Sequence, residues 1–267
     1  MRSSEVEKIS HELASTCRVA DLLQDIGTTL LVSGAHCGRV HRNVERVATQ
    51  WGYQAELFMS FTGLIVSITN IRNPDLHITR FRHCPLPAVH FGVVTEISLL
   101  TWKVLEDGLP IEAVEQRMIE IKSLPHHPRW LILLGIGSAC ACLCLLAGGD
   151  LADAGIAFIA AFSGLFARQE VLKHRFNPMI AFIAASFTTT LIAGADTIYH
   201  IGLSPEKTLA TSVLYLIPGV PMINCVIDLI EGYIPTAIAR GVFGGFILLC
   251  IAVGMSLAIL LLGIHNF

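Results

Sequence analysis

The chain has 267 residues, a formal net charge of −3 at pH 7 and 53% hydrophobic residues. A slightly acidic chain without a basic patch is not expected to bind nucleic acid, and the sequence contains no motif that anchors an enzymatic reaction. The charges are unevenly distributed, since 27 of the 39 charged residues lie at or before Arg129. We therefore expect a soluble domain at 1–125 and a strongly apolar domain at 126–267.

The first thirty residues carry charges throughout and lack an isolated apolar core followed by a cleavage site. This pattern indicates that no secretory signal is present, so the soluble half is expected to stay in the cytoplasm. The eight cysteines are scattered, and three of them (Cys140, Cys142 and Cys144) fall within an apolar run. A disulfide framework is therefore not expected.

In the first half, apolar residues recur every three or four positions, then alternate, and then recur every three or four again. The alternation around Leu57 and Met59 predicts a strand. Thr62-Gly63 indicates a turn, and the β-branched run at 65–68 predicts the returning strand of a hairpin. We expect helices at about 6–31, 38–51, 91–106 and 111–124, and a third strand at 76–82. This order is typical of a small α+β domain.

Two groups of histidine and cysteine residues lie in the first half: His36, Cys37 and His41, and then His77, His83, Cys84 and His90. Neither group has a zinc-site spacing such as paired CxxC or HExxH. We expect these residues to lie on the surface or to be satisfied in the core. No metal site, catalytic residue or cofactor is predicted.

The second half contains long, nearly uncharged apolar runs of the length that crosses a bilayer. Trp130 beside Arg129 is typical of an anchor at the membrane interface. The sequence predicts an all-α polytopic membrane domain with about five spans, at 130–147, 151–167, 176–195, 208–230 and 236–264.

Basic residues predict the orientation of these spans. The loops on the side of the first half carry four basic residues: Arg168, Lys173, Arg175 and Arg240. The loops on the other side carry one, Lys207. The positive-inside rule therefore places the N-terminus in the cytoplasm and the C-terminus outside. Because five is an odd number, a second set of spans would insert upside down, as in transporters built from inverted repeats.

The fourth span is interrupted by Leu-Ile-Pro-Gly-Val-Pro at positions 216–221. Pro218 and Pro221 cannot donate backbone hydrogen bonds, and Gly219 frees the chain further. In a bilayer, a broken helix persists only against protein or a water-filled cavity, and such breaks form the binding sites of many transporters. The break is our leading candidate site, and a purely structural kink is the alternative.

Asn224 and Asp228 follow the break with helical spacing, and Glu231 continues the same face. A carboxylate within a membrane helix is costly, so Asp228 is predicted to carry a coupling proton, with a position near the inner membrane interface as the alternative. Asn224 is predicted to hydrogen-bond the substrate, with interhelical packing as the alternative.

The third span supplies two further polar candidates. Thr189 is predicted to line the pathway, although a threonine can also satisfy its own helix backbone. Asp196, at the end of this span, is expected to be solvated at the outer surface.

The sequence resembles the threonine/serine exporter family along nearly its whole length, in particular the larger subunit of two-component members. The matching segments are Val-Ser-Gly-Ala at 32–35, Glu-Ala at 112–113, Pro-Arg-Trp-Leu at 128–131, Ser-Ala-Cys-Ala-Cys at 138–142, Gly-Gly-Asp at 148–150, the 216–221 break with Asn224, Asp228 and Gly232, and Ala239-Arg240.

This resemblance implies an exporter of a small polar metabolite in the bacterial inner membrane, with a periplasmic C-terminus. It implies succinate or a related C4-dicarboxylate for the two-component branch, and threonine or serine for the fused branch. It also implies a separate small membrane subunit with its own proline-glycine break, and a higher oligomer is left open. Two rivals remain: a membrane-anchored sensor or scaffold, and a channel.

Overall fold

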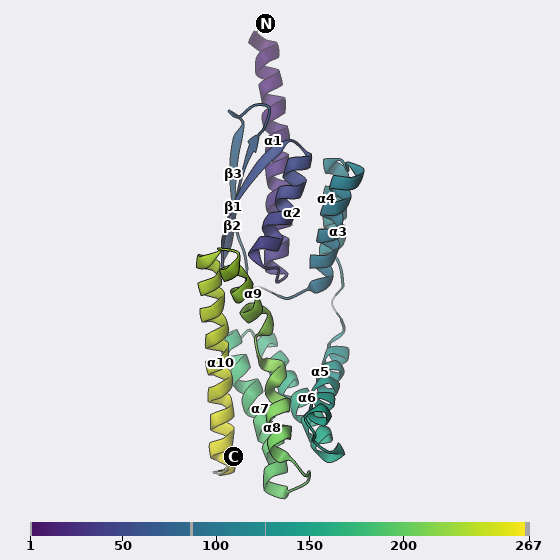
Figure 1. The fold of residues 1–267 in the computed structure, drawn as a ribbon, viewed down its shortest axis with the longest axis vertical. Helices are drawn as coiled ribbons and strands as arrows, with labels where there is room; N and C mark the ends of the chain where they lie inside the picture. The colour runs from purple at the N-terminus through teal and green to yellow at the C-terminus, as the bar shows by residue number, and fades with distance from the viewer. Residues whose placement is uncertain (1, 86–87, 126, 265–267) are drawn as a thin grey trace. The chain divides into compact units, whose positions relative to one another are not determined.

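The computed structural model describes residues 2–85, 88–125 and 127–264, so His126, beside the predicted domain boundary, lies outside the described residues. Figure 1 shows the elements, which are α1 (Arg2–Val32), α2 (Cys37–Gln50), β1 (Tyr53–Ser60), β2 (Gly63–Asn70), β3 (His77–His83), α3 (Phe91–Asp107), α4 (Ile111–Lys122), α5 (Arg129–Leu146), α6 (Leu151–Lys173), α7 (Pro178–Tyr199), α8 (Pro205–Val213), the 3₁₀ helix η1 (Leu214–Leu216), α9 (Gly219–Ile230) and α10 (Ile234–Leu262).

By its packing the chain forms two compact units. Unit 1 comprises Met1–Pro125 and Val220–Val242, and unit 2 comprises His126–Gly219 and Phe243–Phe267. Most of α9 and the first part of α10 therefore pack with the N-terminal half of the chain. The division of the sequence into domains at 1–125 and 126–267 stays a prediction.

Unit 1 contains the predicted three-stranded sheet, with antiparallel order β1-β2-β3. Ser60 pairs with Gly63, so the β1–β2 turn lies where the Thr62-Gly63 signal predicted it. Successive side chains of a strand point to opposite faces. Met59 is accordingly buried, whereas the neighbouring Phe58 is 58% exposed. The alternation in the sequence thus identified both the strand and its inward face.

Helices α1 and α2 cover one face of this sheet, and α3 and α4 pack on the far side of the two helices (Figure 1). The close approach of α1 to the sheet favours a glycine, because a Cβ at Gly27 would lie 2.6 Å from Leu64 Cδ2 and would force the leucine side chain to shift. The core draws apolar side chains from all four helices and from β2: Val19, Leu23, Ile26, Leu30, Val44, Leu64, Ile68, Ile97 and Met118.

The turn between α9 and α10 completes unit 1. Tyr233 packs against the core of this unit, and the Thr236 hydroxyl donates a 2.7 Å hydrogen bond to the Met59 carbonyl. These contacts fasten the start of α10 to the end of β1.

Unit 2 is a helical bundle of α5, α6, α7, α8, η1 and the later part of α10. Small residues allow the helices to approach closely. A Cβ at Gly254 of α10 would lie 2.4 Å from the Ile183 carbonyl oxygen of α7. The outer surface of the bundle carries large apolar side chains, as expected for contact with lipid: Leu146, Leu249, Leu260 and Leu261.

Among the residues that the structure describes, four helices are long and apolar enough to cross a membrane: α5, α6, α7 and α10. The segments Pro205–Leu216 and Gly219–Ile230 meet the same criteria together, as a bent pair, which makes a fifth candidate span. These four to five candidate spans agree with the predicted all-α membrane domain of about five spans. Helix α6 continues to Lys173 rather than ending at 167, and Arg129 stabilises its last turns through a 2.6 Å ion pair with Glu170.

The backbone leaves helical geometry at the start of the 216–221 segment. Ile217 is extended, with φ −61° and ψ 127°, and α9 begins at Gly219. Residues before proline favour this extended conformation. Pro221 lies in the first turn of α9, where its missing N–H has no intrahelical acceptor to lose. Pro218 is thus the proline that interrupts the helix, and Pro221 is tolerated by it.

Candidate functional site

The connection between α1 and α2, which we call the α1–α2 loop (residues 33–36), is the part of the N-terminal half that α9 contacts. Gly34 ends α1 with φ +93°, a left-handed conformation that favours glycine. The Ala35 amide closes this turn through a 3.0 Å hydrogen bond to the Leu30 carbonyl. His36 precedes α2 and caps it, because its Nδ1 accepts from the Arg39 amide at 3.3 Å.

Two buried side chains of α9 bind the main chain around this loop. Asn224 Nδ2 donates to the Gly34 carbonyl at 2.8 Å, and Asp228 Oδ1 accepts from the Cys37 amide at 2.7 Å. Cys37 is the first residue of α2. The Asp228 carboxylate therefore occupies the positive end of a helix that lies nearly two hundred residues away in sequence, where a negative charge is stabilised.

Arg240 of α10 completes this contact. Its Nη1 donates to Asp228 Oδ2 at 2.7 Å, and its Nη2 donates to the Ala35 carbonyl at 3.0 Å. The exposed fractions of the Arg240 and Asp228 side chains are 5% and 0%, so both charges are withdrawn from water. We call the set formed by Asn224, Asp228 and Arg240 with the main chain of residues 34–37 the loop clamp.

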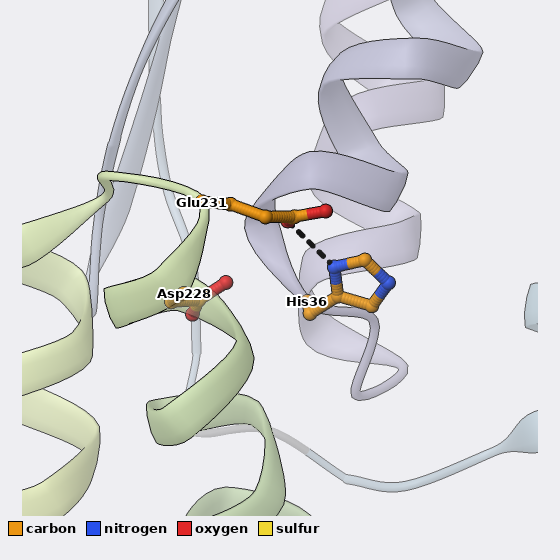
Figure 2. Close-up of side chains that lie close together, drawn as sticks. All are labelled: His36, Asp228 and Glu231. Atoms are coloured by element: carbon orange, nitrogen blue, oxygen red, sulfur yellow. Dashed lines mark hydrogen bonds and ion pairs between the residues drawn. The ribbon is translucent and has the colours of Figure 1, made fainter.

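Glu231 forms a more exposed part of the same network (Figure 2). Its Oε1 accepts from Arg42 Nη1 at 2.9 Å, and its Oε2 lies 3.1 Å from His36 Nδ1. His36 Nδ1 can bind only one of its two neighbours at a time. Without a proton it accepts from the Arg39 amide, and with a proton it donates to Glu231. Arg42 on α2 and His36 directly before it thereby hold Glu231, which lies in the turn after α9.

Burial raises the pKa of Glu231, but the hydrogen bonds from Arg42 and His36 outweigh burial, and the pKa is lowered from its ordinary value. A carboxylate with a lowered pKa contributes stability above its ordinary pKa and loses that contribution as the pH falls through the lowered value. The Glu231 carboxylate is therefore charged at neutral pH, where it accepts from Arg42 Nη1.

Ligand atoms of His36, Asp228 and Glu231 lie within 4.8 Å of one another, a spacing that a metal ion could bridge (Figure 2). Each carboxylate already binds a guanidinium group, however, and Asp228 also binds a backbone amide. A metal would have to displace these donors. We interpret the cluster as a network of ion pairs.

The clamp has a direct consequence for the reactivity of Cys37. Burial raises the pKa of this thiol to about 12, and the residue is fully buried. In a variant with Cys37 as the single cysteine, Asp228→Asn is expected to accelerate maleimide labelling at least about tenfold, because weakening the clamp increases local opening of the loop. Labelling rates measured by mass spectrometry test this expectation.

Glu45→Gln is the matched control, since Glu45 is an exposed carboxylate on α2 and its removal leaves the clamp intact. Equal labelling rates in the Asp228→Asn, Glu45→Gln and unsubstituted proteins would mean that Asp228 does not hold the loop closed.

Asn224 and Asp228 share one face, as their spacing indicated, and the structure turns this face toward the α1–α2 loop. Their contribution to a substrate pathway stays a prediction. Arg240 was counted in the sequence only as an inner-loop charge. Its position six residues inside the apolar α10 is the signal that could have identified it, because such a charge needs a buried partner.

Thr189 belongs to unit 2, where its Oγ1 lies 3.0 Å from the Tyr215 hydroxyl. The expectation that Asp196 is solvated was wrong. Asp196 is 0% exposed and accepts from the Gly202 amide and the Thr208 hydroxyl, each at 2.7 Å. The first donor lies in the connection between α7 and α8, and the second lies in α8 itself, so Asp196 is bonded within the protein rather than to water.

The long apolar helices and the bent pair that precedes α10 are typical of a multi-pass membrane protein. Residues 21–262 match the family model described as “Putative threonine/serine exporter”. The chain belongs to this threonine/serine exporter family. It is a membrane transporter of that family, and the family is not one of enzymes.

Relatives of two kinds are similar to the chain. “Probable succinate transporter subunit YjjP” of Escherichia coli is 30% identical over 93% of this chain and 96% of the relative. The protein of the same name from Klebsiella aerogenes is 29% identical over 89% of this chain and 92% of the relative. “Probable threonine/serine exporter” of Mycobacterium tuberculosis is 24% identical over 94% of this chain but only 47% of the relative. No solved structure gives a significant match.

Proposed function

We propose that the chain is one subunit of an inner-membrane secondary transporter that exports succinate or a related C4-dicarboxylate together with a second, small membrane subunit. The observation that carries this proposal is the match over nearly the full length of two relatives named as succinate transporter subunits. The soluble half lies in the cytoplasm in this proposal, as the bias of basic residues indicates.

Three observations support a partner subunit. The two similar relatives are named subunits, and the Mycobacterium tuberculosis relative, a threonine/serine exporter by name, is about twice the length that the chain matches. With five spans, an odd number, a second set of spans would insert upside down, as in transporters built from inverted repeats. The partner is expected to supply the other half of the transport site.

The proposed pathway runs along the break and uses Pro218, Gly219, Pro221, Asn224, Asp228 and Thr189. A carboxylate substrate is attracted to the amides that open α9, because the N-terminus of a helix carries partial positive charge. The break lies within a candidate span, where an amide without a partner lacks water. Pro221 has no N–H, and the Gly219 amide already donates to the Ile217 carbonyl at 2.8 Å, so in this proposal the substrate binds the amides of Val220 and Met222.

In this proposal Asp228 couples export to protons. Protonation neutralises the carboxylate, which weakens the ion pair with Arg240 and the hydrogen bond from the Cys37 amide. The loop clamp then opens, and α9 becomes free to move. Asp228→Asn, which cannot titrate, is accordingly expected to export without the pH dependence of the unsubstituted protein.

The test is succinate efflux from cells that lack their own succinate exporters. Cells that produce this chain with its small subunit are expected to release succinate, whereas cells with either subunit alone are not. Dissipating the proton gradient should abolish the release. Release that persists without the gradient would indicate a channel, and an absence of release from cells with both subunits would contradict the proposal.

A threonine/serine exporter subunit is the second candidate, and the Mycobacterium tuberculosis relative favours it. Measuring threonine and serine efflux in the same cells separates the two. A sensor or scaffold is the third candidate. It predicts that activity survives when the spans are exchanged for unrelated ones, which a transporter does not permit.

A further inference from the structure

Arg168, near the end of α6, is a half-buried cation without a carboxylate partner in the described part of the chain. Its Nε is buried and makes no hydrogen bond with any described residue. The guanidinium lies over the ring of Phe182 of α7, with 4.3 Å from Cζ to the ring centroid. A stacked guanidinium is held in place on one face while its N–H edge stays free for an acceptor.

Two other cations of unit 2 have partners that Arg168 lacks. Arg129 binds Glu170, and Lys207 Nζ donates to the Gly148 carbonyl at 2.8 Å. Glu170 is two residues from Arg168 in sequence, but its carboxylate binds Arg129. The neighbouring negative charge that could have neutralised Arg168 is therefore already in use. A buried charge of this kind needs a compensating partner.

Two hydroxyl groups lie on the same side of α6 as Arg168. Gly164 precedes Arg168 by one helical turn, and a Cβ there would lie 1.8 Å from Thr189 Oγ1 and 2.5 Å from the Tyr215 hydroxyl. Tyr215 is also within electrostatic range of Arg168. The glycine thus allows the hydroxyl pair of Thr189 and Tyr215, 3.0 Å apart, to reach the face of α6 that carries the guanidinium.

We propose that Arg168, with the hydroxyls of Tyr215 and Thr189, forms a subsite for a carboxylate group of the exported substrate. A planar guanidinium edge matches a carboxylate, and nearby hydroxyls donate to its remaining lone pairs. Tyr215 lies in η1, directly before the break, so the subsite adjoins the proposed pathway. This inference rests on the proposed export of an organic acid. It applies equally to succinate and to threonine, because both carry a carboxylate.

The competing explanation is that Arg168 only anchors α6 by stacking on Phe182. Two substitutions separate the explanations. Arg168→Lys keeps the charge but loses the planar fork, and Arg168→Gln loses both. Arg175→Gln is the matched control, because Arg175 is an exposed arginine a few residues beyond on the same side of the span.

Each variant is produced with the small subunit, and the rate of labelled succinate efflux is measured against internal succinate concentration. Arg168→Gln is expected to lower the apparent affinity roughly 10- to 100-fold, the worth of a charge-assisted hydrogen bond to a carboxylate. Arg168→Lys should lose part of this affinity. Arg175→Gln should remain within about twofold of the unsubstituted protein, as expected for an exposed charge.

Thermal unfolding of the purified complex gives a second measurement that does not need transport. Succinate, but not the neutral succinamide, is expected to stabilise the unsubstituted protein and Arg175→Gln, and to leave Arg168→Gln unaffected. If the unsubstituted protein binds succinate and Arg168→Gln binds it equally well, the subsite is wrong and the exporter stands. If neither succinate nor threonine is exported or stabilises the complex, the proposed function and the subsite both fail.

Discussion

Replacing Arg240 by methionine is expected to lower the free energy of unfolding by about 3–5 kcal/mol, because the change leaves the Asp228 carboxylate buried without its charged partner. The Ala35 carbonyl loses its donor in the same substitution. Unfolding of the purified protein in detergent, followed by circular dichroism across a denaturant series, measures this difference. The amount of protein inserted into membranes should fall in parallel.

Arg42→Met is the matched control. Arg42 also binds a carboxylate of this network, but its side chain is 56% exposed, so its loss should cost less than about 1 kcal/mol. The double variant Asp228→Asn/Arg240→Met should recover part of the stability, because it removes the unpaired charge. Equal effects of Arg240→Met and Arg42→Met would show that the buried pair contributes no more than the exposed one.

Gly219→Leu is expected to abolish export while the protein still folds and inserts. A Cβ at Gly219 meets no atom of the described chain within 4 Å, so a larger side chain fits the structure of this subunit. The space beside the break is, in the proposed function, the space that substrate and the partner subunit use. Succinate efflux and membrane insertion, measured on the same cells, test the two halves of this prediction.

Gly245→Leu provides the control for this prediction. Gly245 also has no atom within 4 Å of an added Cβ, but it lies in the uninterrupted α10. Its replacement should leave export nearly unchanged. Normal export by Gly219→Leu would mean that the break is only a kink.

Local patterns predicted the elements well because each depends on neighbours in sequence. Alternation around Leu57 and Met59 identified β1, and the apolar periods located the helices within a few residues. Helix α6 is longer than the predicted span of 151–167, because a span defined by apolar length stops at the first charge. Arg168 and Glu170 continue the helix instead, one by stacking on Phe182 and the other by binding Arg129.

The hydrogen-bond partners of the predicted site residues could not be predicted from the sequence. The spacing of Asn224 and Asp228 indicated a shared face, but nothing local to α9 indicated that this face meets the α1–α2 loop. These contacts join residues about 190 positions apart, so only the fold brings them together. The prediction that Asp196 is solvated was wrong for the same reason, because its hydrogen-bond donors lie beyond the end of its own helix.

In the loop clamp, the side chains of Asn224, Asp228 and Arg240 bind only main-chain atoms of residues 34–37. These atoms are the carbonyls of Gly34 and Ala35 and the amide of Cys37. Every amino acid supplies a main-chain carbonyl, and every amino acid except proline supplies a main-chain N–H. The groups that bind α9 therefore do not depend on the side chains of Ala35 and Cys37, provided that the left-handed turn at Gly34 is kept. The contact depends instead on the side chains of Asn224, Asp228 and Arg240, because a substitution of any one of them removes a hydrogen bond or ion pair of the clamp.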